Sequence, residues 1–131
     1  MLTQRLLQRA EIEQIWTIDR SEVHHHIYQV ESGDLVRIPA YYEIRGWPPD
    51  QIEQDTPKLY ACFDRGGAFI GMFDAMQLIG VAVVDTILFG EDNTYLQLKY
   101  LYVSQGYRQQ GIGRTLFQEA QRIARTRNAK M

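Results

Sequence analysis

The stretch SQGYRQQGIGRTLF, residues 104–117, places two glycines at the start of a segment that otherwise has the pattern of a helix. A helix N-terminus presents unpaired backbone N–H groups and a partial positive charge, and both favour anions such as phosphates. Gly111 and Gly113 would let a phosphate approach the backbone, and Arg108 and Arg114 add permanent positive charge beside it. The stretch predicts a pyrophosphate-binding loop or, more simply, a tight strand-to-helix turn with solvated arginines.

The segments on both sides of this loop have clear periodic patterns. Residues 95–103 alternate as a strand, with one predicted face of Leu96, Leu98, Tyr100 and Tyr102 and the other of Gln97, Lys99, Leu101 and Val103. The segment after the loop has apolar residues at helical spacing, namely Ile112, Leu116, Ala120, Ile123 and Ala124. Asn128 is a plausible residue to end this helix. The stretch therefore lies between a strand and an amphipathic helix.

Two further strands and a helix are predicted upstream. AFIGMFDA and LIGVAVVDTIL, residues 68–75 and 78–88, indicate strands joined by a tight connection at residues 74–77. The second is apolar almost without interruption, which is typical of a central strand covered on both faces. A helix is predicted before them, with Thr56 as its cap, Pro57 in its first position and Gly66–Gly67 at its end.

The N-terminal part is read less directly. Residues 2–7 predict a short strand, and Ile12, Ile15 and Trp16 have the spacing of an amphipathic helix. Residues 23–49 resemble a hairpin around Gly33, followed by a loop in GWPPD, residues 46–50. Together the elements predict one α/β (α+β) domain spanning residues 1–131.

Composition limits the classes of function. A net charge of −2 argues against a general nucleic-acid binder, and no apolar run reaches the length of a membrane span. The single cysteine, Cys62, excludes an internal disulfide, so we expect a soluble, cytoplasmic protein. His24, His25 and His26 alternate in direction along an extended segment and lack acidic or cysteine ligands at suitable spacing, so no metal site is predicted.

Three nucleotide-binding interpretations of the loop can be separated. A Walker A loop needs a lysine after its last glycine, whereas Gly113 is followed by Arg114. A dinucleotide fingerprint needs a small residue where Leu116 stands and an acidic residue about 20 positions further on, at or beyond the end of the chain. A third interpretation fits the residues better.

The segment LYVSQGYRQQGIGRTLF, residues 101–117, resembles the acetyl-CoA-binding motif of the GNAT superfamily of N-acetyltransferases. The family pattern Arg/Gln-x-x-Gly-x-Gly/Ala is met by Arg108 to Gly113, after a strand that ends in Val103. The resemblance is close over residues 78–127 and loose before residue 56. It implies a GNAT-like mixed, mostly antiparallel central sheet with helices on both faces, without the family's usual last strands and helix.

The resemblance also implies roles for individual residues. The backbone of Gln109, Gln110, Gly111, Ile112, Gly113 and Arg114, with Arg108 beside it, would hold the CoA pyrophosphate. The main chain of Leu101, Tyr102 and Val103 would bind pantetheine and stabilise the oxyanion. The family's glutamate base corresponds to Gln97 or Lys99, which are not carboxylates, and the strand and helix that lead to its tyrosine donor are not found in this sequence. The catalytic residues therefore stay unassigned.

The resulting prediction is an N-acetyltransferase that uses acetyl-CoA as cosubstrate, without a metal, and acetylates a primary amine. Acidic and aromatic residues between positions 41 and 55 could receive a cationic amine, these being Tyr41, Tyr42, Glu43, Trp47, Asp50, Glu53 and Asp55. The alternative of another class is a non-catalytic CoA-binding or interaction module. We also expect a homodimer through an open edge of strand 95–103 or through the last helix.

Overall fold

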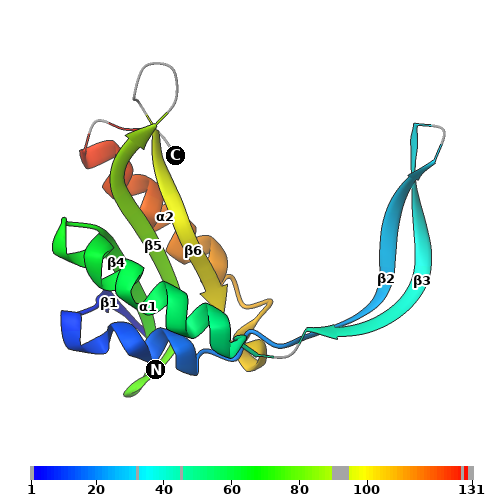
Figure 1. The fold of residues 1–131 in the computed structure, drawn as a ribbon, viewed down its shortest axis with the longest axis horizontal. Coiled ribbons are helices and arrows are strands. Elements are labelled where there is room, and N and C mark those ends of the chain that lie inside the picture. Colours follow the sequence, from blue (N-terminus) through cyan, green and yellow to red (C-terminus); the bar gives the residue numbers. More distant parts are fainter. Residues whose placement is uncertain (1, 32, 45, 90–94, 128, 130–131) are drawn as a thin grey trace.

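The computed structural model describes residues 2–31, 33–44, 46–89, 95–127 and 129. Its elements in chain order are β1 (Leu2–Leu6), η1 (Arg9–Thr17), β2 (Glu22–Glu31), β3 (Asp34–Ile44), α1 (Pro49–Asp64), β4 (Ala68–Asp74), β5 (Gln77–Phe89), β6 (Tyr95–Val103), η2 (Gln105–Tyr107) and α2 (Ile112–Thr126). Strands β1, β4, β5 and β6 form one antiparallel sheet in that order, and β2 and β3 pair separately (Figure 1).

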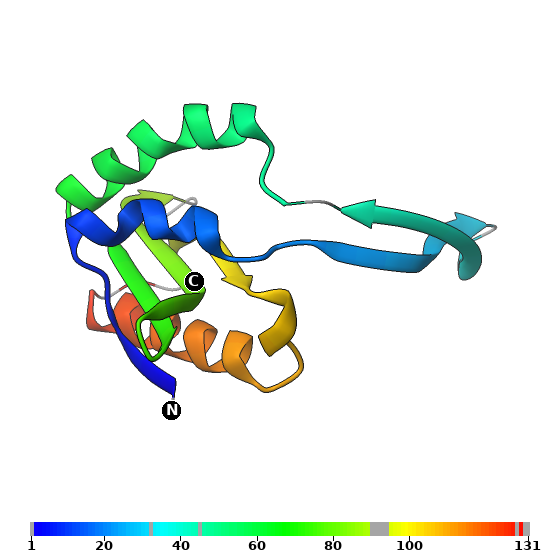
Figure 2. The same ribbon diagram turned by 90° about the horizontal axis from the view of Figure 1, so that it is seen from below.

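Helices cover both faces of the four-stranded sheet, as Figure 2 shows. Helix α2 packs on one face, where its apolar side meets residues such as Ile79 and Ala82 of β5. Helices η1 and α1 pack on the other face, around Phe69 and Val81. The predicted fold class, a mostly antiparallel sheet between helical layers, is confirmed.

Strand β5 is the central element of the sheet, between β4 and β6. Its residues from Leu78 to Asp85 are all buried, so the prediction of a strand covered on both faces is confirmed. The predicted tight connection is also present, because Asp74 and Gln77 pair across the turn from β4 to β5.

The first helix is a 3-10 helix rather than an α-helix. Ile12, Ile15 and Ile18 follow at every third position and are each at most 1% exposed. Three residues per turn bring these side chains onto one side, against the sheet. Trp16, which an α-helical stripe would also bury, is half-buried at the rim of this core.

Helix α1 begins at Pro49, so the predicted start at Thr56 and Pro57 is wrong. Pro48 takes the cap position and Pro49 has the backbone angle that the first turn requires. Pro57 lies inside the helix, where the Thr56 side chain donates a hydrogen bond to the carbonyl of Ile52 at 2.6 Å. The predicted end is confirmed, because Gly66 and Gly67 donate to Phe63 and Cys62 at 2.9 and 2.8 Å.

The hairpin β2–β3 is inserted between η1 and α1 and projects away from the four-stranded sheet (Figures 1 and 2). Gly33, with φ of 83°, stands at its turn, as predicted. Tyr41, Tyr42 and Glu43 belong to β3, whereas Asp50, Glu53 and Asp55 lie on α1. Trp47 lies in the segment between β3 and α1.

Candidate functional site

The two glycines of the loop occupy the turn that starts α2. Gly111 is the N-cap residue with a left-handed backbone, φ 78°, and Gln109 is also left-handed, φ 63°. A side chain at position 111 would be strained in this conformation, which explains a glycine there. Alternation of left-handed and right-handed residues turns successive N–H groups toward one point, as in anion-binding nests.

Neither glycine is covered by other side chains. A Cβ added at Gly111 would meet nothing within 4 Å, and one at Gly113 would touch only Val103 Cγ2, at 3.8 Å. Within the described part of the chain, the N–H groups of residues 109–114 donate to no carbonyl outside α2. The loop therefore presents backbone donors without carbonyl partners outside α2 at the positive end of a 15-residue helix.

The two arginines of the loop differ in their surroundings. Arg114 is exposed on the first turn of α2. The half-buried Arg108 instead points back under the loop, where its guanidinium donates hydrogen bonds to the carbonyls of Val103, Ser21 and Asp19 at 3.0, 2.8 and 3.2 Å. Position in the motif alone did not separate these two environments.

A β-bulge divides β6 into two parts with opposite orientation. Val83 pairs with Tyr100 and Val84 pairs with Leu98, so Lys99 is an extra residue on β6. Leu98 packs with α2, whereas Tyr100 packs with η1 and α1. The predicted common face of Leu96, Leu98, Tyr100 and Tyr102 is therefore wrong, because the bulge reverses the alternation at Lys99.

Four rings form an aromatic cluster over the second part of β6, namely Trp16, Trp47, Tyr100 and Tyr102. Trp47 lies at its centre, 4.9 Å from Trp16 and 4.6 Å from Tyr102 between ring centroids. Hydrogen bonds fix both indoles, from Trp16 to Thr56 Oγ1 and from Trp47 to the carbonyl of Ile18. The guanidinium carbon of Arg20 stands 4.9 Å from the Trp47 ring centroid.

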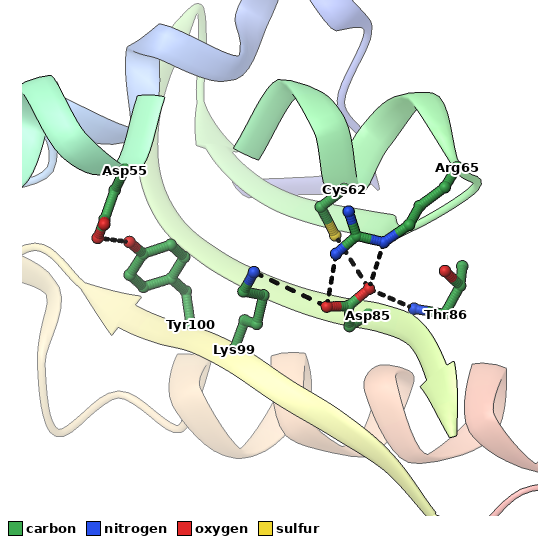
Figure 3. A network of polar contacts seen from close by, with 7 residues as sticks. All are labelled: Asp55, Cys62, Arg65, Asp85, Thr86, Lys99 and Tyr100. Carbon is green, nitrogen blue, oxygen red and sulfur yellow. Dashed lines mark hydrogen bonds and ion pairs between the residues drawn. The ribbon is translucent and has the colours of Figure 1, made fainter. Parts of the chain in front are cut away.

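A carboxylate adjoins this cluster. Tyr100 donates a short hydrogen bond from its hydroxyl to Asp55 on α1 (Figure 3). Burial raises the pKa of Tyr100, and the hydrogen bond to the Asp55 carboxylate raises it further, so the phenol stays protonated. Of the acidic residues predicted for a cationic amine, Asp55 reaches the aromatic cluster, whereas Asp50 and Glu53 are exposed on α1.

A second polar network lies beside the bulge (Figure 3), and no pattern in the sequence predicted it. Asp85, 4% exposed, accepts two hydrogen bonds from Arg65 at 3.0 and 2.8 Å, and Lys99 Nζ lies 3.7 Å from its carboxylate. Burial raises the pKa of Asp85, but the bonds from Arg65 and the Thr86 N–H outweigh it and lower the pKa to about 2. Lys99 therefore serves the ion pair, while Gln97 is exposed.

Other candidate sites are separate from this one. A cavity of about 490 Å³ lies between β1, the end of α1 and the second half of α2, lined by residues such as Phe63, Gly66 and Arg127, and contains none of the predicted site residues. No group of three or more metal-ligating side chains occurs among the residues that the structure describes. In the same residues, no helix combines the length and apolarity of a membrane span.

Comparisons with known proteins show which family and fold the chain resembles. The family model described as "Acetyltransferase (GNAT) family" matches residues 25–131. Among solved structures, nourseothricin acetyltransferase aligns with a TM-score of 0.70 and 22% identity over 98% of this chain and 69% of its own. A protein described as a streptothricin acetyltransferase from Bacillus anthracis, in complex with acetyl coenzyme A, aligns with a TM-score of 0.68 and 17% identity. The alignment covers 98% of this chain and 70% of that protein.

A third structure, PaiA N-acetyltransferase from Thermoplasma acidophilum in complex with coenzyme A, aligns with a TM-score of 0.61 and 20% identity over 97% of this chain and 74% of its own. At these identities the structures show a common fold. No curated protein matches the chain. The family model covers well over half of the residues and includes the whole of β6, the glycine loop and α2. The chain belongs to the GNAT acetyltransferase family.

Proposed function

We propose that this protein binds acetyl-CoA at the end of β6 and at the glycine loop, and transfers the acetyl group to a primary amine. The observation that carries the proposal is the set of backbone N–H groups of residues 109–114 that donate to no carbonyl outside α2 in the described part of the chain, between the end of β6 and η2 on one side and α2 on the other. Family membership supports acetyl-CoA as cosubstrate, and two fold neighbours were solved with acetyl-CoA or CoA.

Each part of the loop has a defined task in this proposal. The backbone of residues 109–114 receives the pyrophosphate, and the exposed Arg114 adds positive charge to its rim. The main chain of Leu101, Tyr102 and Val103 binds the amides of pantetheine. An N–H group of this strand segment would donate to the thioester oxygen as the neutral amine nitrogen attacks the carbonyl carbon. The C–S bond then breaks, the CoA thiolate leaves, and the proton lost by the nitrogen passes to the thiolate or to solvent.

The aromatic cluster and Asp55 are proposed as the acceptor side. Aromatic faces and a carboxylate together favour a cation, and an amine acceptor is an ammonium ion before it loses its proton. Arg20 stacks on Trp47 and Tyr102, so a cationic acceptor would have to displace its guanidinium from these rings or use the faces of Trp16 and Tyr100 instead. Asp55 would hold the cationic acceptor by its negative charge, and it is not assigned the role of general base.

Calorimetry with CoA tests the cofactor site. We expect binding by the wild type, and no heat with millimolar CoA would contradict the proposal. Substitution of Arg114 by methionine should weaken CoA more than it weakens pantetheine, which lacks the phosphates.

A non-catalytic CoA-binding module is the second candidate. It is favoured by the exposed Gln97 and by the ion pair that occupies Lys99, because neither position offers a carboxylate base. Release of free thiol from acetyl-CoA in the presence of a panel of amines separates the two functions. An enzyme releases CoA in proportion to acceptor, whereas a module binds CoA without release.

We also propose a homodimer and a cytoplasmic location. Strand β6 ends the four-stranded sheet in the described part of the chain, and its free edge or α2 could pair with a second copy. Light scattering at micromolar concentration tests the dimer, and a monomer mass would exclude it.

A further inference from the structure

The root of the hairpin β2–β3 is hydrogen-bonded to the segment that leads into the glycine loop. Asp19 is tied by its backbone on both sides, because its N–H donates to Ser104 Oγ at 2.8 Å and its carbonyl accepts from the Gln105 N–H at 2.9 Å. Ser104 is itself buried, 6% exposed. These bonds join residues that are 85 and 86 positions apart in the sequence.

Arg108 completes this junction. Its guanidinium uses three N–H groups on three carbonyls, one at the end of β6 (Val103) and two in the hairpin root (Asp19 and Ser21). The planar fork of arginine can bridge two chain segments in this way, whereas the ammonium of lysine is a compact point charge. The geometry therefore uses the shape of arginine and not only its charge.

The segment that follows β3 returns to the hairpin root, beside the segment that precedes β2. Trp47, three residues after β3 ends, donates its indole N–H to the carbonyl of Ile18 at 2.9 Å. Arg20, on the first leg, lies over the ring of Trp47. The segments before β2 and after β3 are thus both held next to the end of β6. Arg108 connects this region with the loop that starts α2.

We propose that Arg108 is a positioning residue that couples the hairpin root to the cofactor loop, and not a ligand of the CoA phosphates. The proposal rests on the proposed binding of acetyl-CoA at this loop. CoA binding and the arrangement of the hairpin root then stabilise each other, since both depend on the same backbone segment. The family pattern alone would place Arg108 beside the pyrophosphate, together with Arg114.

Three variants separate these roles, namely Arg108→Lys, Arg108→Met and the matched control Arg114→Met. Calorimetry measures their affinity for CoA and for pantetheine. If Arg108 is a positioning residue, Arg108→Lys and Arg108→Met weaken CoA and pantetheine by the same factor, about tenfold. Arg114→Met weakens CoA selectively. If Arg108 bound phosphate, Arg108→Lys would keep most of the affinity and Arg108→Met would affect CoA alone, which would overturn the proposal.

Tryptophan fluorescence gives a readout of the coupling. The chain has two tryptophans, Trp16 and Trp47, and both lie in the aromatic cluster at the hairpin root. We expect saturating CoA to change their emission in the wild type and in Arg114→Met, and to leave it nearly unchanged in Arg108→Lys. An equal change in Arg108→Lys would show that the rings sense CoA directly, and would contradict the coupling.

Ser104→Ala keeps the proposal testable if the Arg108 variants do not fold. It removes the acceptor of the Asp19 N–H but leaves both arginines in place. A smaller emission change at saturating CoA, with equal losses for CoA and pantetheine, is expected. A wild-type emission change in Ser104→Ala would overturn the proposal, whereas absence of CoA binding by the wild type would refute the proposed function instead.

Discussion

The Tyr100 hydroxyl on β6 donates a hydrogen bond to the carboxylate of Asp55 on α1, across 45 positions of sequence. This bond joins the strand whose end is proposed to bind pantetheine with the helix that carries the acidic side chain proposed for the acceptor side. It exists because the bulge at Lys99 turns Tyr100 toward α1. The bond therefore depends on the local geometry of β6 and reports on it.

Substitution of Tyr100 by phenylalanine should lower the free energy of unfolding by about 1–2 kcal/mol, because the Asp55 carboxylate loses its donor in a partly buried place. Urea denaturation measures the change. Tyr102→Phe is the matched control, since Tyr102 lies beside Tyr100 in the same aromatic cluster and its hydroxyl is not the donor to Asp55. Equal stability of Tyr100→Phe and Tyr102→Phe would contradict a stabilising role for the bond.

Substitution of Gly111 by alanine distinguishes a pyrophosphate loop from a simple turn, and Gly113→Ala is its matched control because the family pattern accepts alanine at position 113. In Gly113→Ala the new Cβ would make an ordinary contact with Val103 Cγ2 at 3.8 Å, so stability and CoA affinity should stay close to those of the wild type. In Gly111→Ala the side chain is strained at φ 78°, and CoA affinity should fall at least tenfold, about 1.4 kcal/mol, because the backbone N–H groups lose the arrangement that receives the phosphate. Gly106→Ala, at an open position outside the proposed site, should bind CoA normally.

If Gly111→Ala binds CoA as tightly as the wild type, the glycine at position 111 serves the turn alone. Calorimetry on Gly111→Ala, Gly113→Ala and Gly106→Ala under identical conditions decides this. Thermal unfolding of the three variants shows whether a loss of CoA affinity is a loss of fold.

The elements that the sequence predicted well are those set by local chemistry. The apolar run of β5, the glycines after α1 and the turn at residues 74–77 each specify their structure within a few residues. The glycine loop is also local, and the left-handed backbone of Gly111 agrees with the expected turn. Sequence periodicity is informative where neighbours along the chain are also neighbours in space.

The parts that the sequence did not predict depend on distant contacts. The bulge at Lys99 interrupts an otherwise regular alternation and is accompanied by an ion pair with Asp85 on the adjacent strand. The aromatic cluster gathers Trp16, Trp47 and Tyr100 from three separate elements. The environment of Arg108 depends on the hairpin root 87 positions earlier. No pattern in a single segment encodes such contacts.

Substitution of Gly80 by alanine tests how closely α2 approaches β5. A Cβ at this position would lie 3.1 Å from Leu116 Cδ1 and 3.4 Å from Ile112 Cγ2, both on the first turns of α2. The Leu116 side chain would have to move by a few tenths of an ångström in a packed core, and overpacking of this kind costs about 1–3 kcal/mol of unfolding free energy. Adding Leu116→Val should recover part of the loss in urea denaturation, and a lack of recovery would argue against this contact as the cause.

The carboxylate of Asp85 should make acid stability depend on pH in a defined window. Its pKa of about 2 in the folded protein is below the ordinary 3.8, so the unfolded chain binds more protons between these values. The stabilisation, about 2 kcal/mol for a shift of this size, is complete above pH 4 and is lost as pH falls toward 2. Asp85→Asn lacks the stabilisation from this carboxylate. The difference in unfolding free energy between the variant and the wild type should therefore shrink as pH falls from about 4 to about 2.

Urea denaturation at several pH values between 2 and 6 measures this difference. Glu11, whose pKa is also about 2 because of the Arg5 side chain and the Gln8 N–H, titrates in the same window, so Glu11→Gln provides the matched control. The part of the pH dependence of the unfolding free energy that remains in Glu11→Gln but disappears in Asp85→Asn is due to Asp85. A stability difference that stays constant from pH 4 to pH 2 would mean that the ion pairs with Arg65 and Lys99 do not hold Asp85 charged, and that the bulge at Lys99 is maintained by packing alone.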